Sequence, residues 1–338
     1  MAGSSLPSTI RIWQYTKTRG GLEKNLKLNS VPAPTPNPDQ HLVQVIATAL
    51  NPVDYKVAEL PVIGSFLPKP ATPGIDFAGR IVTPASNSAF KRGDCIVGAT
   101  ATDPMAGGGL SEYILVKDET IVAVPQGIDP VDAAAIPVAG LSAYQSVLPH
   151  VKQGDNVFIN GGSGGTGVFG IQIAKASGTH VTTTCSTVNV ELCRSLGADR
   201  VIDYKKEKVV EALNASGVRF DHVVDNVGSD MSLYWRCHEY TKPSALYVYV
   251  GHPMNVGAFV SSMTRKVLPG FLGGGKRRST GFLAAAKADD LRQIVKWMEE
   301  GKVRSVIDSK FAFDQVPQAF ERLKTGRAKG KIIVLNQE

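Results

Sequence analysis

The stretch Val157-Phe-Ile-Asn-Gly-Gly-Ser-Gly-Gly-Thr-Gly-Val-Phe-Gly170 decides the fold of this chain. Its apolar start predicts a strand, its glycines predict a tight turn, and the residues from Gly167 onward predict a helix. Glycines let the backbone approach a pyrophosphate closely, and free N–H groups at a helix start bind an anion. The stretch therefore predicts a dinucleotide-binding turn. The alternative is a turn needed only for close packing of helix on strand.

Strands and helices are expected to alternate around this turn. Strands are predicted at residues 157–160, 180–185, 200–204, 222–225 and 245–250, and helices at about 167–177 and 190–196. This alternation is typical of βαβ units, which form a parallel sheet covered on both faces. The predicted class is α/β, with a doubly wound sheet of the Rossmann type in residues 129–290.

The remaining sequence predicts a β domain built from residues 1–128 and 291–338. Short β-type runs broken by Pro and Gly occur at residues 41–49, 79–82, 95–99, 110–116 and 121–124, and the four prolines within 31–38 predict a loop. Near the end, apolar residues at helical spacing predict a helix that Asp289 caps and Gly301 ends. A second helix is expected near 316–324 and a closing strand at 331–335.

Composition excludes several protein classes. The 338 residues are 43% hydrophobic and 20% charged, which is typical of a folded chain. Apolar runs are far shorter than the roughly 18–20 residues of a membrane span. The polar start does not resemble a secretory signal, and four scattered cysteines without a C-x-x-C pair favour reduced thiols and a cytoplasmic location.

Positive charge is concentrated in one region. The formal net charge is +7, and residues 240–288 hold seven Lys or Arg and no acidic residue. The region is interpreted as a solvated surface loop, or as a surface for an acidic partner, an anionic membrane face or a phosphorylated ligand. No nucleic-acid partner is expected, because no row of aromatic residues accompanies the charge.

The segment after the strand at 180–185 predicts which cofactor binds. An NAD site usually places a carboxylate here on the ribose 2′-hydroxyl, but this chain has Ser186, Thr187 and Asn189, with no acid before Glu191. Hydroxyl and amide groups suit a 2′-phosphate, so NADPH is predicted. The same polar residues also suit the start of the following helix, which does not exclude a role in binding.

Several motifs carry a resemblance to a known family. They include Asn51-Pro-Val-Asp-Tyr-Lys56, Pro73-Gly-Ile-Asp-Phe-Ala-Gly79, Gly108-Gly-Leu-Ser-Glu-Tyr113 and Gly330-Lys-Ile-Ile-Val334. With the glycine turn, they make the chain resemble the medium-chain dehydrogenase/reductase superfamily over its whole length. The similarity is specifically to the zinc-free quinone oxidoreductase branch, which includes chloroplast envelope quinone oxidoreductase homologues and fungal and plant enone reductases. The resemblance implies a GroES-like partial barrel completed by the C-terminal segment, a cleft between the domains for substrate and nicotinamide, and a homodimer formed through an edge strand near residues 280–283.

The resemblance also bears on metal binding. Zinc members of the superfamily have a Cys in the early loop, a Gly-His-Glu triplet and a four-Cys lobe, whereas this chain has Asn51, Gly74-Ile-Asp76 and no such lobe. No metal site is therefore predicted. No histidine shares a helix face with another metal ligand at helical spacing, so the six histidines are interpreted as surface or capping residues.

The resemblance assigns catalytic roles to the early loop. Without a metal, hydride transfer to the β-carbon of an enone, or to a quinone, builds negative charge on the substrate oxygen, which hydrogen-bond donors must stabilise. Asn51 and Lys56 are implied to lie beside the nicotinamide ribose, with Tyr55 next to them. Lys56 is expected to stabilise the enolate directly or through the ribose hydroxyl, and Tyr55 to shape the pocket or relay a proton. Alternatively, Lys56 only fixes the cofactor and solvent protonates the enolate.

Cofactor contacts are predicted along the second domain. Those in and after the glycine turn are Gly161, Ser163, Gly164, Gly165, Thr166, Gly167, Val168, Ser186 and Asn189. By resemblance, further contacts are Ser142 near the phosphate, Tyr204 at the 2′-phosphate, and Asn226, Val227, Val250, Gly251 and Lys331 around the nicotinamide half. Plant relatives carry a basic residue where Val188 stands, which implies a weaker hold on the 2′-phosphate here.

Together these features predict an enzyme: a zinc-independent, NADPH-dependent reductase of an activated C=C bond in a small enone, or of a quinone. Two alternatives stay open. One is a trans-acting enoyl reductase of a polyketide pathway, whose acidic carrier protein would meet residues 265–278; the same residues could instead meet an anionic membrane surface. The other is a non-catalytic NADPH-binding protein.

Overall fold

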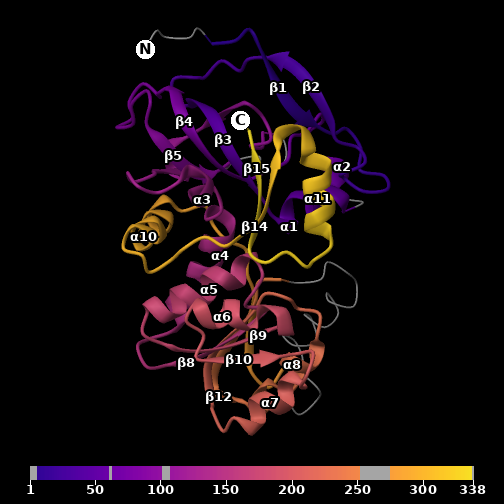
Figure 1. Cartoon of the computed structure of the whole chain (residues 1–338), viewed down its shortest axis with the longest axis vertical. Coiled ribbons are helices and arrows are strands. Elements are labelled where there is room, and N and C mark those ends of the chain that lie inside the picture. Colours follow the sequence, from indigo (N-terminus) through magenta and orange to yellow (C-terminus); the bar gives the residue numbers. More distant parts are fainter. Residues whose placement is uncertain (1–5, 61–62, 101–106, 252–274, 337–338) are drawn as a thin grey trace. The chain divides into compact units, whose positions relative to one another are not determined.

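The computed structural model describes residues 6–60, 63–100, 107–251 and 275–336 (Figure 1). The chain forms two compact units, Met1–Leu141 with Ala286–Glu338, and Ser142–Ala285. The sequence places these boundaries at 128/129 and 290/291. The first differs because helix α3 (Pro130–Ala134) packs on strands of the first unit, and the backbone N–H of Val138, in α4 (Pro137–Val147), donates to Asp76 at 2.9 Å.

The second unit is a parallel sheet with the strand order β10-β9-β8-β11-β12-β13. This is the Rossmann order, in which the chain starts near the middle, moves to one edge and then returns to build the other half. The predicted α/β class is therefore confirmed. The strands are β8 Asn156–Asn160, β9 His180–Cys185, β10 Arg200–Asp203, β11 Phe220–Asp225, β12 Thr241–Tyr249 and β13 Arg278–Gly281. The helices between them are α5 Gly165–Ala176, α6 Val190–Ser195, α7 Val209–Ala215 and α8 Met231–Trp235.

Helix α5 starts in direct contact with the turn that precedes it. Gly161 has φ +82°, a conformation that favours glycine. A Cβ atom on Gly167 would lie 2.1 Å from the carbonyl oxygen of Gly161, closer than any side chain permits. Glycine at 167 is therefore required for the packing of α5 against the turn, and this requirement holds whether or not a ligand binds there.

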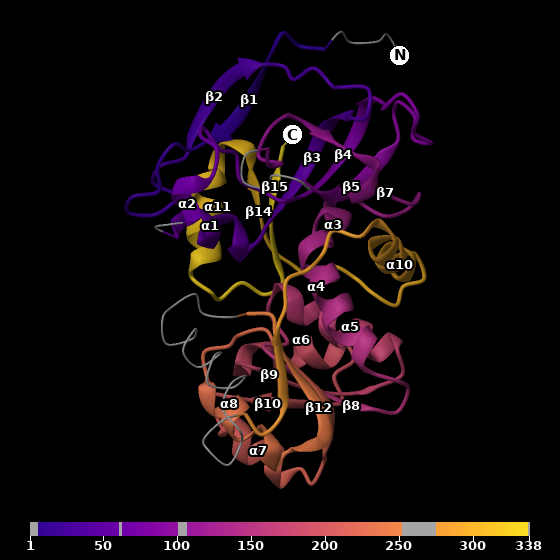
Figure 2. The same cartoon turned by 180° about the vertical axis from the view of Figure 1, so that it is seen from behind.

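The first unit contains a barrel-like sheet with the order β14-β15-β3-β4-β5-β7, and β6 also pairs with β3. Strand β15, the last of the chain, pairs antiparallel with β3, so that Ile332 faces Leu50 (Figures 1 and 2). The C-terminal segment thus completes the barrel, as the GroES-like resemblance predicts. The strands are β3 His41–Leu50, β4 Asp76–Thr83, β5 Cys95–Ala99, β6 Tyr113–Val116, β7 Ile121–Ala123, β14 Ile307–Ala312 and β15 Lys331–Leu335.

Several elements of the first unit differ from the predictions. A hairpin of β1 (Thr9–Gln14) and β2 (Lys27–Pro32) extends into the segment predicted to be a loop, because Pro32 and Val31 pair with β1. Helix α1 (Pro52–Glu59) and the short α2 (Ile63–Phe66) were not predicted. The late helix α10 (Ala288–Glu299) has Lys287 rather than Asp289 at its N-cap, whereas α11 (Val316–Lys324) lies where the sequence predicts a helix.

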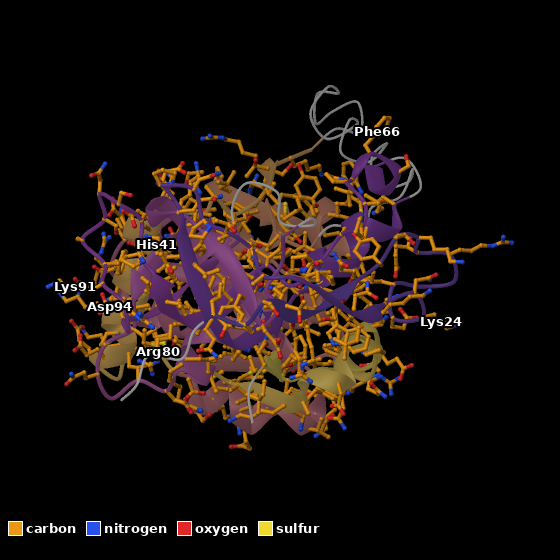
Figure 3. The ribbon with its side chains drawn as sticks, turned by 90° about the horizontal axis from the view of Figure 1, so that it is seen from above. Lys24, His41, Phe66, Arg80, Lys91 and Asp94 are labelled. Atoms are coloured by element: carbon orange, nitrogen blue, oxygen red, sulfur yellow. The ribbon has the colours of Figure 1, made fainter. Side chains whose placement is uncertain are left out.

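Two of the histidines interpreted as surface or capping residues are buried. His41 and His222 are both 0% exposed. The His41 Nδ1 accepts from the backbone N–H of Ala85 at 3.1 Å, so its Nε2 carries the hydrogen and donates to Asp118 at 2.6 Å. Figure 3 shows His41 on the same side of the molecule as the turn between β4 and β5. The buried His41 side chain thus links the backbone at Ala85 to the side chain of Asp118.

The surroundings of two glycines in α5 predict different effects on stability when each is replaced by alanine. Gly167→Ala should lower the melting temperature, because the new Cβ forces α5 away from Gly161, at a cost of about 1–3 kcal/mol. Gly170→Ala places its Cβ in ordinary contact, 3.5 Å from Ile159, and should be neutral or stabilising by up to about 1 kcal/mol. Thermal unfolding of both variants without added nucleotide makes the comparison. Equal melting temperatures would show that α5 tolerates a side chain at the turn.

Candidate active site

The predicted cofactor residues of the second unit gather at one edge of its sheet. Strands β8 to β12 are parallel, so their carboxyl ends share an edge, where open α/β sheets bind ligands. The glycine turn follows β8, Ser186 and Asn189 follow β9, Tyr204 follows β10, Asn226 and Val227 follow β11, and Val250 and Gly251 follow β12. Ser142 lies buried on α4.

The glycine turn presents backbone donors. Gly164 is the N-cap of α5 and offers no side chain as a cap, so the first N–H groups of the helix, from Gly165 to Gly167, have no acceptor within it. Next to the turn, the amide nitrogen of Asn189 donates to the hydroxyl of Ser163 at 3.0 Å. The buried Oδ1 of Asn189 has no hydrogen-bond partner among the described residues. It remains an acceptor for a ligand hydroxyl.

Asp225, at the end of β11, organises the neighbouring loop. Its Oδ1 accepts from the side chain of Asn160 at 2.8 Å and from the backbone N–H groups of Val227 and Gly228 at 3.0 and 2.9 Å. The hydroxyl of Tyr247 donates to its other oxygen at 2.8 Å. These bonds fix the backbone on either side of Asn226, although sequence reasoning did not single out Asp225.

The side-chain amide of Asn226 is the clearest case of an unsatisfied buried group at this edge. Both polar atoms of its side chain are buried and have no partner within the described part of the chain. Gly251 lies against it, since a Cβ on Gly251 would be 2.0 Å from the carbonyl oxygen of Asn226. Buried amides are normally satisfied, so an unsatisfied one at a ligand-binding edge fits a ligand with both donor and acceptor groups. A nicotinamide dinucleotide has these groups, and the donors of the glycine turn suit its pyrophosphate.

The ends of β9 and β10 lie side by side. The backbone N–H of Tyr204 donates to the carbonyl of Cys185 at 3.1 Å, which places Tyr204, half exposed, beside the segment that begins at Ser186. The neighbouring strand also brings in a carboxylate, Asp203, that sequence reasoning missed. A hydrogen bond from Thr187 lowers the pKa of Asp203, so this acid is ionised. Pairing between the strands, which local sequence does not reveal, puts it there.

The remaining predicted residues belong to the first unit. Lys331, 2% exposed, donates to Asn51 Oδ1 at 2.5 Å and to Asp76 Oδ2 at 3.2 Å, and Asn51 Nδ2 donates to the same oxygen of Asp76 at 2.8 Å. Both polar groups of the Asn51 side chain are thus engaged by buried neighbours. Burial raises the pKa of Asp76, and the Lys331 ammonium opposes that rise.

Asp54 fixes the start of α1. It lies at the third position of the helix, where its Oδ2 accepts from the backbone N–H of Asn51 at 2.7 Å, while its Oδ1 accepts from that of Ile75 at 3.1 Å. The spacing from Asn51 to Asp54 is that of a capping box, a signal present in the sequence. Burial, helped by the nearby charge of Asp76, raises the pKa of Asp54 from its ordinary value of 3.8 to about 7.

Tyr55 and Lys56 point in different directions because neighbouring helical residues are about 100° apart around the axis. The Tyr55 ring packs against the core of the first unit, with the Lys324 ammonium 5.1 Å from its centroid. Lys324 in turn pairs with Glu23 and Glu59. Burial raises the pKa of Tyr55, so its hydroxyl is protonated at neutral pH. Lys56 is exposed.

In the part of this unit that the structure describes, side chains of the types that bind zinc do not cluster. Within the described ranges, no three His, Cys, Asp or Glu side chains lie close enough together to hold a metal ion. At the Asn51–Asp76 cluster, the Lys331 ammonium already provides the positive charge that the carboxylate needs. A second cation there would be repelled by Lys331.

The basic region is only partly described. Residues 265–274 of the predicted basic surface lie outside the described residues. Arg277 is bound within its own unit, because its guanidinium donates to the hydroxyl of Thr241 at 3.0 Å and to the Thr241 carbonyl at 3.1 Å. Within the described part of the chain, no helix has the length and apolar character needed to cross a bilayer.

Comparison with known families and proteins agrees with this geometry. Residues 37–126 match the alcohol dehydrogenase GroES-like domain, and residues 196–334 match the zinc-binding dehydrogenase family. A trans-enoyl reductase of Aspergillus terreus is 46% identical over 98% of this chain and 97% of its own length. A chloroplast envelope quinone oxidoreductase homologue of Arabidopsis thaliana is 33% identical over 95% and 97%. The quinone oxidoreductase structure from Coxiella burnetii superimposes with a TM-score of 0.84, at 29% identity, over 97% of this chain and all of that one.

The raised pKa of Asp54 predicts a pH-dependent effect of Asp54→Asn. A folded-state pKa of about 7, above the ordinary 3.8, means that the folded protein binds a proton more tightly than the unfolded chain. The contribution of Asp54 to stability is then complete below pH 3.8 and is lost as the pH rises through 7. The destabilisation caused by Asp54→Asn should therefore be larger at pH 5 than at pH 8 in urea unfolding. A destabilisation that grows with pH would show that the N–H donors keep the carboxylate ionised.

Proposed function

Because the chain belongs to the medium-chain dehydrogenase/reductase superfamily, we propose that it is a zinc-independent, NADPH-dependent reductase of C=C bonds conjugated to a carbonyl group. The observation that carries the cofactor part is that one sheet edge holds the backbone donors of the glycine turn, the unsatisfied Oδ1 of Asn189 and the unsatisfied amide of Asn226. The relatives support the reaction, since they are named as a trans-enoyl reductase, a quinone oxidoreductase homologue and an alkenal/one oxidoreductase.

The chemistry requires a donor for the oxygen of the acceptor. A bound nicotinamide supplies the hydride, and negative charge then develops on the carbonyl oxygen of the substrate. Lys56 is proposed to stabilise that charge, because its ammonium is exposed on α1 and is not committed to a buried carboxylate. Asn51, whose side chain is held by Lys331 and Asp76, is proposed to fix the start of α1. Tyr55, protonated at neutral pH, is proposed to shape the pocket or relay a proton.

Charge stabilisation by a protein cation makes a metal unnecessary in this scheme. In zinc enzymes the metal polarises the carbonyl as a Lewis acid. Here the buried cluster that contains Asn51 and Asp76 is already neutralised by Lys331 at 3.2 Å, which does not suit a metal. The proposed reaction therefore has no step through zinc.

NADPH is proposed as the cofactor because of the segment after β9. Ser186 and Asn189 offer a hydroxyl and an amide, and the segment itself has no carboxylate before Glu191. Asp203 comes close to this segment from β10, but it accepts a hydrogen bond from Thr187 and has the Lys206 ammonium 3.9 Å away. Its charge is thereby partly offset, which leaves the segment suited to a 2′-phosphate.

A second candidate concerns how the substrate is presented. The similarity to a trans-enoyl reductase supports an enoyl thioester on a carrier protein as the acceptor, in place of a free enone or quinone. An acidic carrier would suit the positive charge of residues 265–278, and an anionic membrane would suit the same charge. A homodimer formed through the edge strand β13 remains a further proposal.

Oxidation of the nucleotide tests the proposal and separates the candidates. With NADPH, a free-enone reductase should turn over simple enones, and mass spectrometry should find the saturated product two hydrogens heavier. A carrier-dependent enzyme should reduce an enoyl thioester on a carrier but barely reduce the free enone. Affinity for NADPH should exceed that for NADH by at least about tenfold in fluorescence titration. Tight NADPH binding without turnover of any acceptor would instead indicate a non-catalytic binding protein.

Substitution of Lys56 tests the assigned catalytic role. Lys56→Met should slow single-turnover hydride transfer about 10- to 100-fold while changing NADPH affinity much less, because the interaction strengthens as charge develops on the substrate. Tyr55→Phe should cost less, since solvent can replace a proton relay. Lys91→Met, which removes another exposed lysine of the same unit, is the control for loss of charge. If Lys56→Met weakens NADPH binding and leaves the single-turnover rate unchanged, Lys56 is only a cofactor anchor.

A further inference from the structure

The loop after β10 places positive charge beside the segment that would select the cofactor. We propose that Lys205 is the side chain that recognises the 2′-phosphate of the nucleotide and so gives this chain its preference for NADPH. The inference rests on the proposed function and assigns the recognition to one residue. It is needed because Val188, in the middle of the segment after β9, is 76% exposed and has no charge to offer.

Strand pairing brings Lys205 to the correct edge. Asp203 is paired with Cys185, and Tyr204 donates to the carbonyl of Cys185, so the segments after β9 and β10 leave the sheet at the same level. The backbone N–H of Lys205 donates to Asp203 Oδ1 at 3.0 Å, which fixes the turn that follows the strand. Lys205 therefore starts next to the segment that contains Ser186, although 19 positions separate them in sequence.

The Lys205 side chain stays close to the predicted adenosine contact. Its Nζ lies 5.7 Å from the centroid of the Tyr204 ring, a cation–π distance. Tyr204 is half exposed, so the ring and the ammonium together face solvent where a ligand can reach both. An aromatic ring with an adjacent cation suits an adenosine whose ribose carries a phosphate.

The same loop forms a wall of a cavity of about 490 Å³. This volume lies within the usual range of about 300–1,000 Å³ for ligand pockets. Three lysines and one arginine line it, together with the acidic residues Glu207, Glu211 and Asp230. The Arg236 guanidinium is committed to Glu239 at 2.8 Å and to Glu211 at 2.9 Å. The charge available to an anion therefore comes from the lysines of the loop.

Among these lysines, Lys205 is the best placed for the phosphate. The Lys206 ammonium lies 3.9 Å from Asp203 Oδ2, so its charge mainly offsets that ionised carboxylate. Lys208 lies further along the loop, at the N-cap of α7. Within the described residues, Lys205 forms no ion pair, although its charge, like that of Lys206, acts on the Asp203 carboxylate. Its ammonium lies over the Tyr204 ring, where a ligand phosphate could bind it.

Calorimetric titration of the full chain with two nucleotides tests this assignment. Adenosine 2′,5′-bisphosphate and 5′-AMP differ only in the 2′-phosphate. Lys205→Met should weaken binding of the bisphosphate about tenfold and binding of 5′-AMP less than twofold, whereas Lys205→Arg should retain most of the affinity. Lys152→Met is the matched control, because Lys152 is an exposed lysine of the same unit. It precedes β8 and so lies near the amino ends of the parallel strands, away from the carboxyl ends that Lys205 follows. This control variant should leave both affinities unchanged.

The outcomes separate this inference from the proposed cofactor. If the unmodified protein prefers the bisphosphate and Lys205→Met loses that preference, the assignment is supported. The assignment to Lys205 is wrong, while the NADPH proposal stands, if Lys205→Met still prefers the bisphosphate over 5′-AMP. The same holds if Lys206→Met loses more of that preference than Lys205→Met does. If the unmodified protein binds both nucleotides equally, the NADPH preference is itself wrong and the inference fails with it.

Discussion

Buried carboxylates that each accept several hydrogen bonds fix two segments: the one that carries the proposed catalytic residues and the one that carries the proposed cofactor contacts. In the first unit, Asp76 is fully buried and accepts from Asn51, Lys331 and the backbone of Val138. One carboxylate thus joins the loop before α1, the last strand and α4. Removing one partner of a buried ion pair costs about 3–5 kcal/mol, so this arrangement is strongly constrained. Asp225 does the same in the second unit, where its four donors set the loop around Asn226.

The sequence predicted the second unit better than the first because the signals of the second are local. A glycine turn between a strand and a helix, followed by regular alternation, is enough to predict a doubly wound sheet. The hairpin of β1 and β2 gives no such signal, since nearly every residue of β2 is exposed and shows no apolar alternation. Its pairing with β1 is what makes it a strand. The domain boundary was missed for a related reason, because α3 and the start of α4 belong to the first unit through contacts with distant strands.

The same distinction applies to the candidate site. The resemblance could name residues after several of the parallel strands, and the pairing of those strands brings the named residues to one edge. Sequence could not show that the Asn226 amide is left without a partner, or that Asp203 comes beside Thr187 from the neighbouring strand. Both facts depend on contacts between residues far apart in the chain. Asp54 is different, because its spacing from Asn51 is a capping signal that the sequence already contained.

The cations of this protein divide according to whether they already have a buried partner. Lys331 is held by Asn51 and Asp76, so moving it toward a new negative charge would leave a buried carboxylate unpaired. Its charge supports the fold and is not available to a reaction. Lys56 and Lys205 are exposed, and within the described chain neither forms an ion pair with a buried carboxylate. Each can therefore turn toward a charge brought by a ligand. In the function proposed here, binding and catalysis therefore use the cations that folding leaves without a buried partner, and the paired cations keep in place the backbone that carries them.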